Sequence, residues 1–192
     1  AQEYMNDARD ISDASFKIDR IQKHNHTFVP KDKFGYLEDD KGDFIPINVY
    51  IGVDVAATAT KKSDFQVIMV IGIDKNKNRY ILEYFHERIP TFDVPEKIIA
   101  LAKKYSPVKR VTIETVAAQE MVRDMVTRIA TKDRRLIPGI FKGVRPPAGI
   151  KKEDRLETSL GPIVNSKKLY IRSSMTEIVD EFFEHPFAKH DD

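Results

Sequence analysis

Apolar and polar residues alternate most clearly between residues 49 and 56. Every second residue there is valine or isoleucine, and the positions between them include one carboxylate, Asp54. A period of two is typical of a β-strand, so we expect the side chain of Asp54 to project from the face opposite the apolar one. An ionised group is costly to remove from water, so a carboxylate on a strand that is otherwise apolar requires a functional or structural explanation.

Two further strands are predicted after this one. Residues 65–73 are apolar on both faces, which is typical of a strand in the centre of a sheet. The turn-forming cluster DKNKN separates them from residues 79–88, which we predict to pair with 65–73 as a hairpin. We therefore expect the first three strands to be antiparallel.

The pattern then changes to an alternation of helices and strands. From Asp93, which can cap a helix, apolar residues recur at helical spacing. The later elements predicted in the same way are a strand at 109–114, a helix around 121–129, a strand at 136–144, a helix at 151–160, a short strand at 169–171 and a helix after 174. The order predicts an α/β fold, in which a mixed sheet of five or more strands is flanked by helices.

The first 45 residues differ from the rest because they are polar and only weakly periodic. Within them and just beyond, residues 33–47 have two apolar flanks around an Asp-Asp-Lys-Gly-Asp turn, which predicts a hairpin. His24 and His26 also lie in this part, and we interpret them as surface residues rather than metal ligands. We divide the chain into a linker or tail at 1–45 and a domain at 46–192.

Composition limits the chemistry. The chain of 192 residues is 41% hydrophobic and 32% charged, which is typical of a globular domain. Cysteine is absent, so disulfides, thiolate zinc sites and cysteine nucleophiles are excluded, and oxygen ligands for Mg²⁺ or Mn²⁺ are favoured. The longest apolar run, 67–73, is far shorter than the ~20 residues that span a bilayer, and no signal peptide is recognisable. We expect a soluble cytoplasmic protein with no membrane contact.

Two acidic residues share an unusual setting. Glu114, like Asp54, points away from the apolar face of its strand, and it is the last strand residue before a helix. If the two strands are parallel neighbours, the carboxylates approach each other, and two charges about 4 Å apart repel by about 4 kcal/mol at an effective dielectric of about 20. A divalent cation relieves such repulsion, and the pair Asp191 and Asp192 offers further ligands. Spacing alone leaves a purely structural role open, because strand aspartates also form hydrogen bonds or lie at sheet edges.

Several segments together resemble a known family. YIGVDVAATATKKSDFQVIMVIGID, VTIETVAAQEMV and KHDD, in this order, are similar to the nuclease domain of the large terminase subunit of tailed bacteriophages, a member of the ribonuclease H-like superfamily. The resemblance covers residues 46–192. The stretch AQEYMND resembles the end of the terminase ATPase domain, so the chain looks like an excised carboxy-terminal domain.

The resemblance implies a metal-dependent endonuclease that cuts double-stranded viral DNA during genome packaging. Asp54, Glu114, Asp191 and Asp192 would then bind two Mg²⁺ or Mn²⁺ ions, and Asp64 matches a further acid often found before the second strand. Portal protein and the small terminase subunit are the partners implied for the full assembly, in the cytoplasm of the host. We expect the isolated domain to be monomeric.

A basic stretch after the fifth predicted strand is the candidate DNA contact. The residues expected to meet phosphates are Lys142, Arg145, Lys151, Lys152 and Arg155. Such contacts position a nucleic acid without reading its sequence.

Three alternatives remain open at this stage. One is another ribonuclease H-like nuclease, such as an integrase, a transposase or a junction resolvase. A second is an actin- or hexokinase-like ATPase, which the absence of glycine in VAATATKKSD disfavours because a phosphate hairpin needs glycine. The third is a docking module for DNA or protein whose acids only cap helices.

Overall fold

The computed structural model describes residues 17–31, 33–55, 65–114, 119–133 and 136–184. Within them, one sheet contains β1 (Gln22–His24), β2 (Thr27–Lys31), β3 (Phe34–Glu38), β4 (Phe44–Asp54), β5 (Gln66–Asp74), β6 (Arg79–Glu87), β7 (Val108–Glu114), β8 (Phe141–Val144) and β9 (Leu169–Arg172). The helices are α1 (Val94–Lys104), α2 (Gln119–Lys132), α3 (Lys152–Asn165) and α4 (Thr176–Glu184), with short 3₁₀ helices η2 (Ile18–Arg20) and η3 (Pro138–Ile140). No helix among these residues is long and apolar enough to cross a membrane.

The sheet is mixed, as the sequence predicts. Strands β4, β5 and β6 are successive antiparallel neighbours, and β7 pairs in parallel with β4 on the other side. Strand β8 extends the sheet in parallel beyond β7, while β9 joins β6 in parallel. The predicted α/β fold with a mixed sheet, of five or more strands of which the first three are antiparallel, is therefore confirmed.

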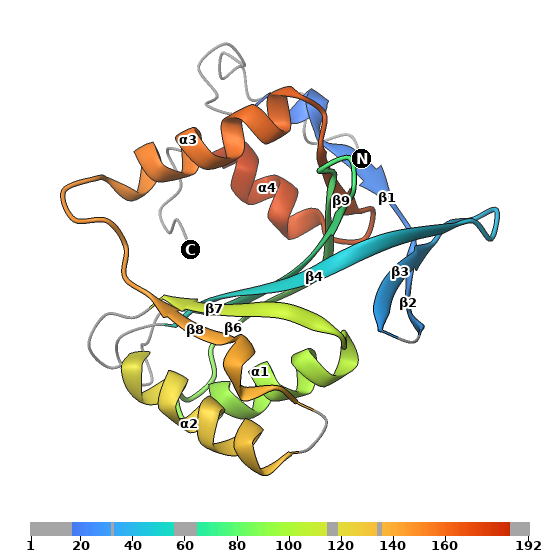
Figure 1. Cartoon of the computed structure of the whole chain (residues 1–192). Coiled ribbons are helices and arrows are strands. Elements are labelled where there is room, and N and C mark those ends of the chain that lie inside the picture. Colours follow the sequence, from blue (N-terminus) through green and yellow to red (C-terminus); the bar gives the residue numbers. More distant parts are fainter. Residues whose placement is uncertain (1–16, 32, 56–64, 115–118, 134–135, 185–192) are drawn as a thin grey trace.

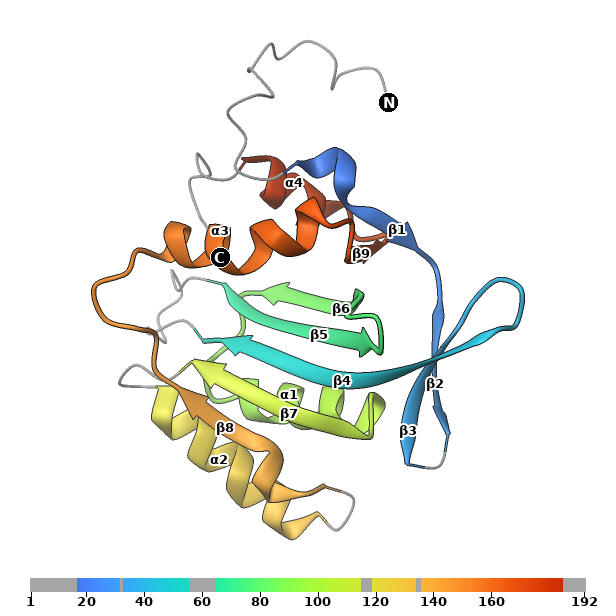
Figure 2. The same ribbon diagram turned by 45° about the horizontal axis from the view of Figure 1, so that its top comes forward.

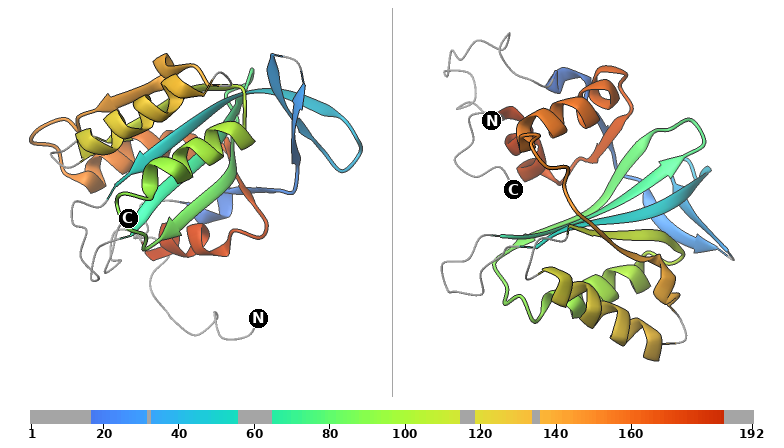
Figure 3. Two further views of the ribbon diagram at one scale, coloured as in Figure 1. Left: turned by 90° about the horizontal axis from the view of Figure 1, so that it is seen from below. Right: turned by 60° about the vertical axis from the view of Figure 1, so that its left-hand side comes forward.

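Helices cover both faces of the sheet (Figures 1 and 3). On one face α1 and α2 pack on the larger core, to which β4 contributes Ile51 and Val53 and β7 contributes Ile113. On the other face α3 and α4 form a smaller core around Ile171, with Met69 of β5 packed at its edge. Along β4 and β7, the residues between those of the larger core therefore point to the opposite face, towards α3 and α4.

The hairpin expected at 33–47 is present, and it lengthens the first strand of the domain. Strand β3 pairs antiparallel with β4 across a turn at residues 39–43, so β4 begins at Phe44 and not at residue 49. Figure 2 shows β2 and β3 at the end of this long strand. Strands β1, β2 and β3, which precede residue 46, belong to the same sheet as the rest of the described chain.

Three expectations about single elements were wrong. His24 is not a surface residue: it is 4% exposed, because β1 pairs with β9 and the ring of His24 packs against that of Tyr80 on β6. Residues 136–144 are not one strand, since Pro138 opens η3 and only the last four residues are extended. Helix α3 continues to Asn165 through Pro162, because its apolar side chains pack into the smaller core and outweigh the roughly 3 kcal/mol cost of an internal proline.

Candidate active site

Two carboxylates end two neighbouring strands. In the parallel pairing of β4 with β7, Val53 lies opposite Ile113, and the next residues are Asp54 and Glu114. Val53 and Ile113 are buried in the larger core, so the period of two places both acids on the opposite face, where each is partly buried. The structure therefore brings together the two acids that the sequence singles out, at the carboxyl ends of parallel strands.

Both acids line a cleft of about 350 Å³. Its floor is formed by β4, β5 and β7, and one wall comes from residues 144–147, where the chain leaves β8 on its way to α3 (Figure 2). Apolar side chains, including Met69 and Pro146, make up much of the lining. A water-poor wall beside a carboxylate pair strengthens the attraction between that pair and any cation bound there.

The donor set fits a hard divalent cation. Carboxylate oxygens are the ligands that Mg²⁺ and Mn²⁺ prefer, and neither Asp54 nor Glu114 forms an ion pair or hydrogen bond through its side chain with another described residue. Two unpaired carboxylates on adjacent strands need a compensating positive charge. No group of three or more acidic or histidine side chains within the described ranges could hold a metal ion. The further expected ligands, Asp64, Asp191 and Asp192, lie outside those ranges.

Two of the five predicted phosphate contacts line the cleft. Arg145 and Arg155 stand at its rim together with the acids, and the buried Nε of Arg155 has no hydrogen-bond partner among the described residues. The guanidinium of an arginine that lines the cleft is a suitable donor to phosphate oxygens. Lys142 and Lys151 are exposed on β8 and just before α3, and the side chain of Lys152 lies outside the described part.

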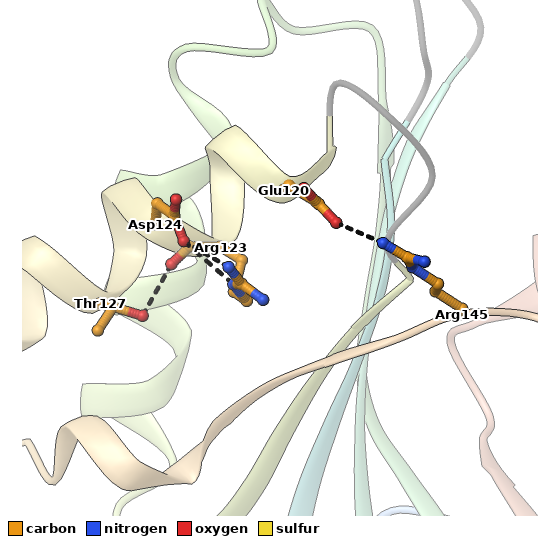
Figure 4. A network of polar contacts seen from close by, with 5 residues as sticks. All are labelled: Glu120, Arg123, Asp124, Thr127 and Arg145. Atoms are coloured by element: carbon orange, nitrogen blue, oxygen red, sulfur yellow. Dashed lines mark hydrogen bonds and ion pairs between the residues drawn. The ribbon is translucent and has the colours of Figure 1, made fainter.

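Arg145 has a partner that the sequence did not reveal. Its guanidinium donates to Glu120 in the first turn of α2 across 3.0 Å (Figure 4). The next turn of α2 holds a separate pair, in which Arg123 binds Asp124 at 2.7 Å. Both Glu120 and Arg145 are exposed, so the contact is weak and can be exchanged for another anion.

Two residues of the floor were also missed from the sequence. Gly52 of β4 and Thr112 of β7 face each other in the sheet, on the same side as the acids. The period of two that singled out Asp54 and Glu114 also places the residues two positions earlier on that side. The alternation was therefore a sufficient signal for both.

Comparison of sequences finds no related protein, whereas comparison of folds finds similar structures. No protein-family model and no curated protein sequence matches the chain. The fold is similar to that of the P22 large terminase nuclease domain, with a TM-score of 0.52 and 12% identity over 88% of this chain and 77% of that one. It is also similar to the human cytomegalovirus terminase nuclease domain, with a TM-score of 0.51 and 14% identity over 76% and 78% of the two chains. The resemblance to terminase nuclease domains is thus confirmed at the level of the fold.

Proposed function

We propose that the chain is a metal-dependent endonuclease domain that cuts double-stranded DNA during viral genome packaging. The observation that carries the proposal is the pair of unpaired carboxylates, Asp54 and Glu114, on adjacent parallel strands in a cleft rimmed by arginines. The similarity of fold to two terminase nuclease domains supports the same assignment.

The acids of the cleft would hold the catalytic metal. Asp54, on the more central strand, and Glu114 would hold the ions together with the predicted ligands Asp191 and Asp192, with Asp64 as a further candidate. When bound, two Mg²⁺ or Mn²⁺ ions activate a water molecule and stabilise the leaving oxygen of a phosphodiester. Because both strands are hydrogen-bonded within the sheet, Asp54 and Glu114 are held in place before substrate arrives.

The basic residues would orient the DNA. Arg155 lines the cleft and can present its guanidinium to a phosphate oxygen, and Arg145 can exchange Glu120 for a second phosphate. Lys142 and Lys151, both exposed, would extend this positive surface along the chain from β8 to α3, and Lys152 remains a predicted contact. Contacts of this kind are made to the DNA backbone, so we propose that cutting has low sequence specificity.

In a packaging assembly, this domain would act in the host cytoplasm on DNA delivered by the rest of the motor. The partners that the family resemblance implies are a portal protein and a small terminase subunit. The isolated domain would be a monomer that binds double-stranded DNA.

Digestion of a supercoiled plasmid tests the proposal directly. We expect nicked and linear products with Mg²⁺ or Mn²⁺, and none with EDTA or with the Asp54→Asn variant. Asp40→Asn is a matched control, because it removes the same charge from the exposed turn before β4, at the other end of that strand. Failure to cut with either metal, or equal cutting by Asp54→Asn, would refute the assignment. A strong preference for four-way junctions over linear duplex would favour a resolvase instead.

A further inference from the structure

A glycine lies in the middle of the cleft floor, two residues before Asp54. Gly52 is exposed on β4, opposite Met69 of β5 on one side and Thr112 of β7 on the other. These three residues form a row across the sheet, and Asp54 occupies the next row towards the carboxyl end of β4. All four residues line the cleft.

Neither the backbone nor the packing of the described residues explains this glycine. Gly42 has a φ of +82°, and a Cβ at Gly72 would lie 2.6 Å from the Cδ1 atom of Ile47, so each of these two has a structural reason. Gly52 has neither: its φ lies outside the left-handed region, and a Cβ added there meets no heavy atom within 4 Å. Glycine within a strand costs about 0.5–1 kcal/mol relative to alanine, so it lowers stability here without a structural gain.

The free space above Gly52 is bordered by groups that suit a sugar–phosphate chain. Met69 offers an apolar thioether, against which a deoxyribose ring can pack. The hydroxyl of Thr112 can donate to a phosphate oxygen, and Arg155, which also lines the cleft, carries a positive charge that attracts phosphate. Glycine inside a strand often marks a position where a ligand approaches the main chain closely.

We infer that Gly52 is the point where the sugar–phosphate backbone of the DNA strand being cut comes closest to the protein main chain. This inference rests on the proposed nuclease function. A side chain at position 52 would lift the strand away from the floor and so move the phosphodiester away from Asp54 and Glu114. The carboxylates themselves would keep their positions, because a Cβ has room in the folded protein.

The test compares Gly52→Ala and Gly52→Val with Gly161→Ala. Gly161 is a matched control because a Cβ there also meets no heavy atom within 4 Å, yet the residue lies on α3 and does not line the cleft. Each variant is measured for binding of a fluorescent DNA duplex in EDTA, Mn²⁺ affinity by calorimetry, plasmid cutting with Mn²⁺, and melting temperature.

We expect cutting to fall on the order of tenfold for Gly52→Ala and about a hundredfold for Gly52→Val, since a displacement of about 1 Å can cost that much. Duplex binding in EDTA should weaken in the same order. Mn²⁺ affinity should stay unchanged, and the melting temperature should stay the same or rise. Gly161→Ala should cut and bind like the unchanged protein.

Normal cutting and duplex binding by Gly52→Val would overturn the inference and leave the nuclease assignment intact. A loss of Mn²⁺ affinity or a lower melting temperature in the Gly52 variants would also overturn it, because the glycine would then serve the carboxylates or the fold. If the unchanged protein does not cut with Mn²⁺, the proposed function itself fails, and that result is distinct from the others.

Discussion

Asp54 and Glu114 lie side by side, each one residue beyond the Val53–Ile113 pair that joins β4 to β7 in parallel. They are sixty positions apart in the sequence, and only the strand pairing brings them together. Each acid is the last residue of a strand that is hydrogen-bonded to its neighbours. The sheet therefore fixes the backbone position of both acids. Because both side chains are carboxylates, their closeness makes the pair sensitive to any change of charge.

Neutralising one member of the pair should abolish cutting and spare the fold. We expect Asp54→Asn and Glu114→Gln to lower Mn²⁺-dependent cutting by more than about a hundredfold, because each removes a metal ligand. In the metal-free protein, each should raise the free energy of unfolding, by about 1 kcal/mol or less, because the repulsion between two partly buried carboxylates is relieved. Plasmid digestion and denaturant unfolding in EDTA measure the two effects.

The two readouts separate a metal site from a structural role. If both variants are less stable in EDTA than the unchanged protein, the carboxylates support the fold and do not repel each other. If both variants still cut DNA with unchanged metal dependence, Asp54 and Glu114 are not ligands of the catalytic metal. Calorimetry with Mn²⁺ adds an independent check, since a docking module without a metal site shows no binding that depends on Asp54.

The contact between Glu120 and Arg145 should restrain DNA binding. Glu120→Gln removes an acid close to the cleft and frees Arg145 for phosphate, so we expect duplex binding to strengthen about two- to fivefold, within the 1 kcal/mol of an exposed ion pair. Asp124→Asn is the control, because it removes the same charge from α2 and leaves the pair at Arg145 unchanged. Equal strengthening by both variants, measured by fluorescence anisotropy, would mean that net charge matters and Arg145 does not.

DNA binding should weaken steeply with salt and show little preference among sequences. If all five predicted basic residues meet phosphates, the logarithm of the binding constant should fall with the logarithm of salt concentration with a slope of about −4.5, at about −0.9 for each contact. Arg155→Gln should reduce the size of the slope by about 1. Titrations of unrelated duplexes between low and physiological salt test both points, and one discrete cut in every plasmid would contradict the expected lack of specificity.

A structural feature can be predicted from this sequence when neighbouring residues determine it, and not when it depends on contacts between distant segments. The period of two in residues 49–56 is local, so it placed Asp54 on the correct face without knowledge of the fold. The contact between Glu120 and Arg145 joins α2 to the segment after β8, and no local pattern marks it. The passage of α3 through Pro162 depends on packing into the smaller core, which overrides a local preference.

The burial of His24 is the feature that the sequence predicted least well, because it arises from pairing with a strand near the other end of the chain. The Nε2–H of His24 donates to the carbonyl oxygen of Ile81 across 3.0 Å, which requires a proton on Nε2. Burial lowers the pKa of His24 from its usual value near 6.5 to about 4, and the positive charges of Arg172 and His26 add to the effect. The aromatic ring of Tyr80 packs edge-on against the ring of His24, with 5.6 Å between the ring centroids.

Stability should therefore fall as the pH drops from about 6.5 to about 4. Since the pKa of His24 is lower in the folded than in the unfolded protein, the unfolded chain binds more protons in that interval. The difference of about 2.5 pH units corresponds to a loss of up to about 3 kcal/mol in the free energy of unfolding. His24→Gln keeps an N–H donor for Ile81 but does not titrate, so we expect its free energy of unfolding to depend less on pH across the same interval. Denaturant unfolding at half-unit steps from pH 4 to 7.5 measures both proteins, with His26→Gln as the control for a neighbouring histidine that is less buried. Parallel curves for the unchanged protein and His24→Gln would show that other groups, such as the carboxylates, carry the pH dependence.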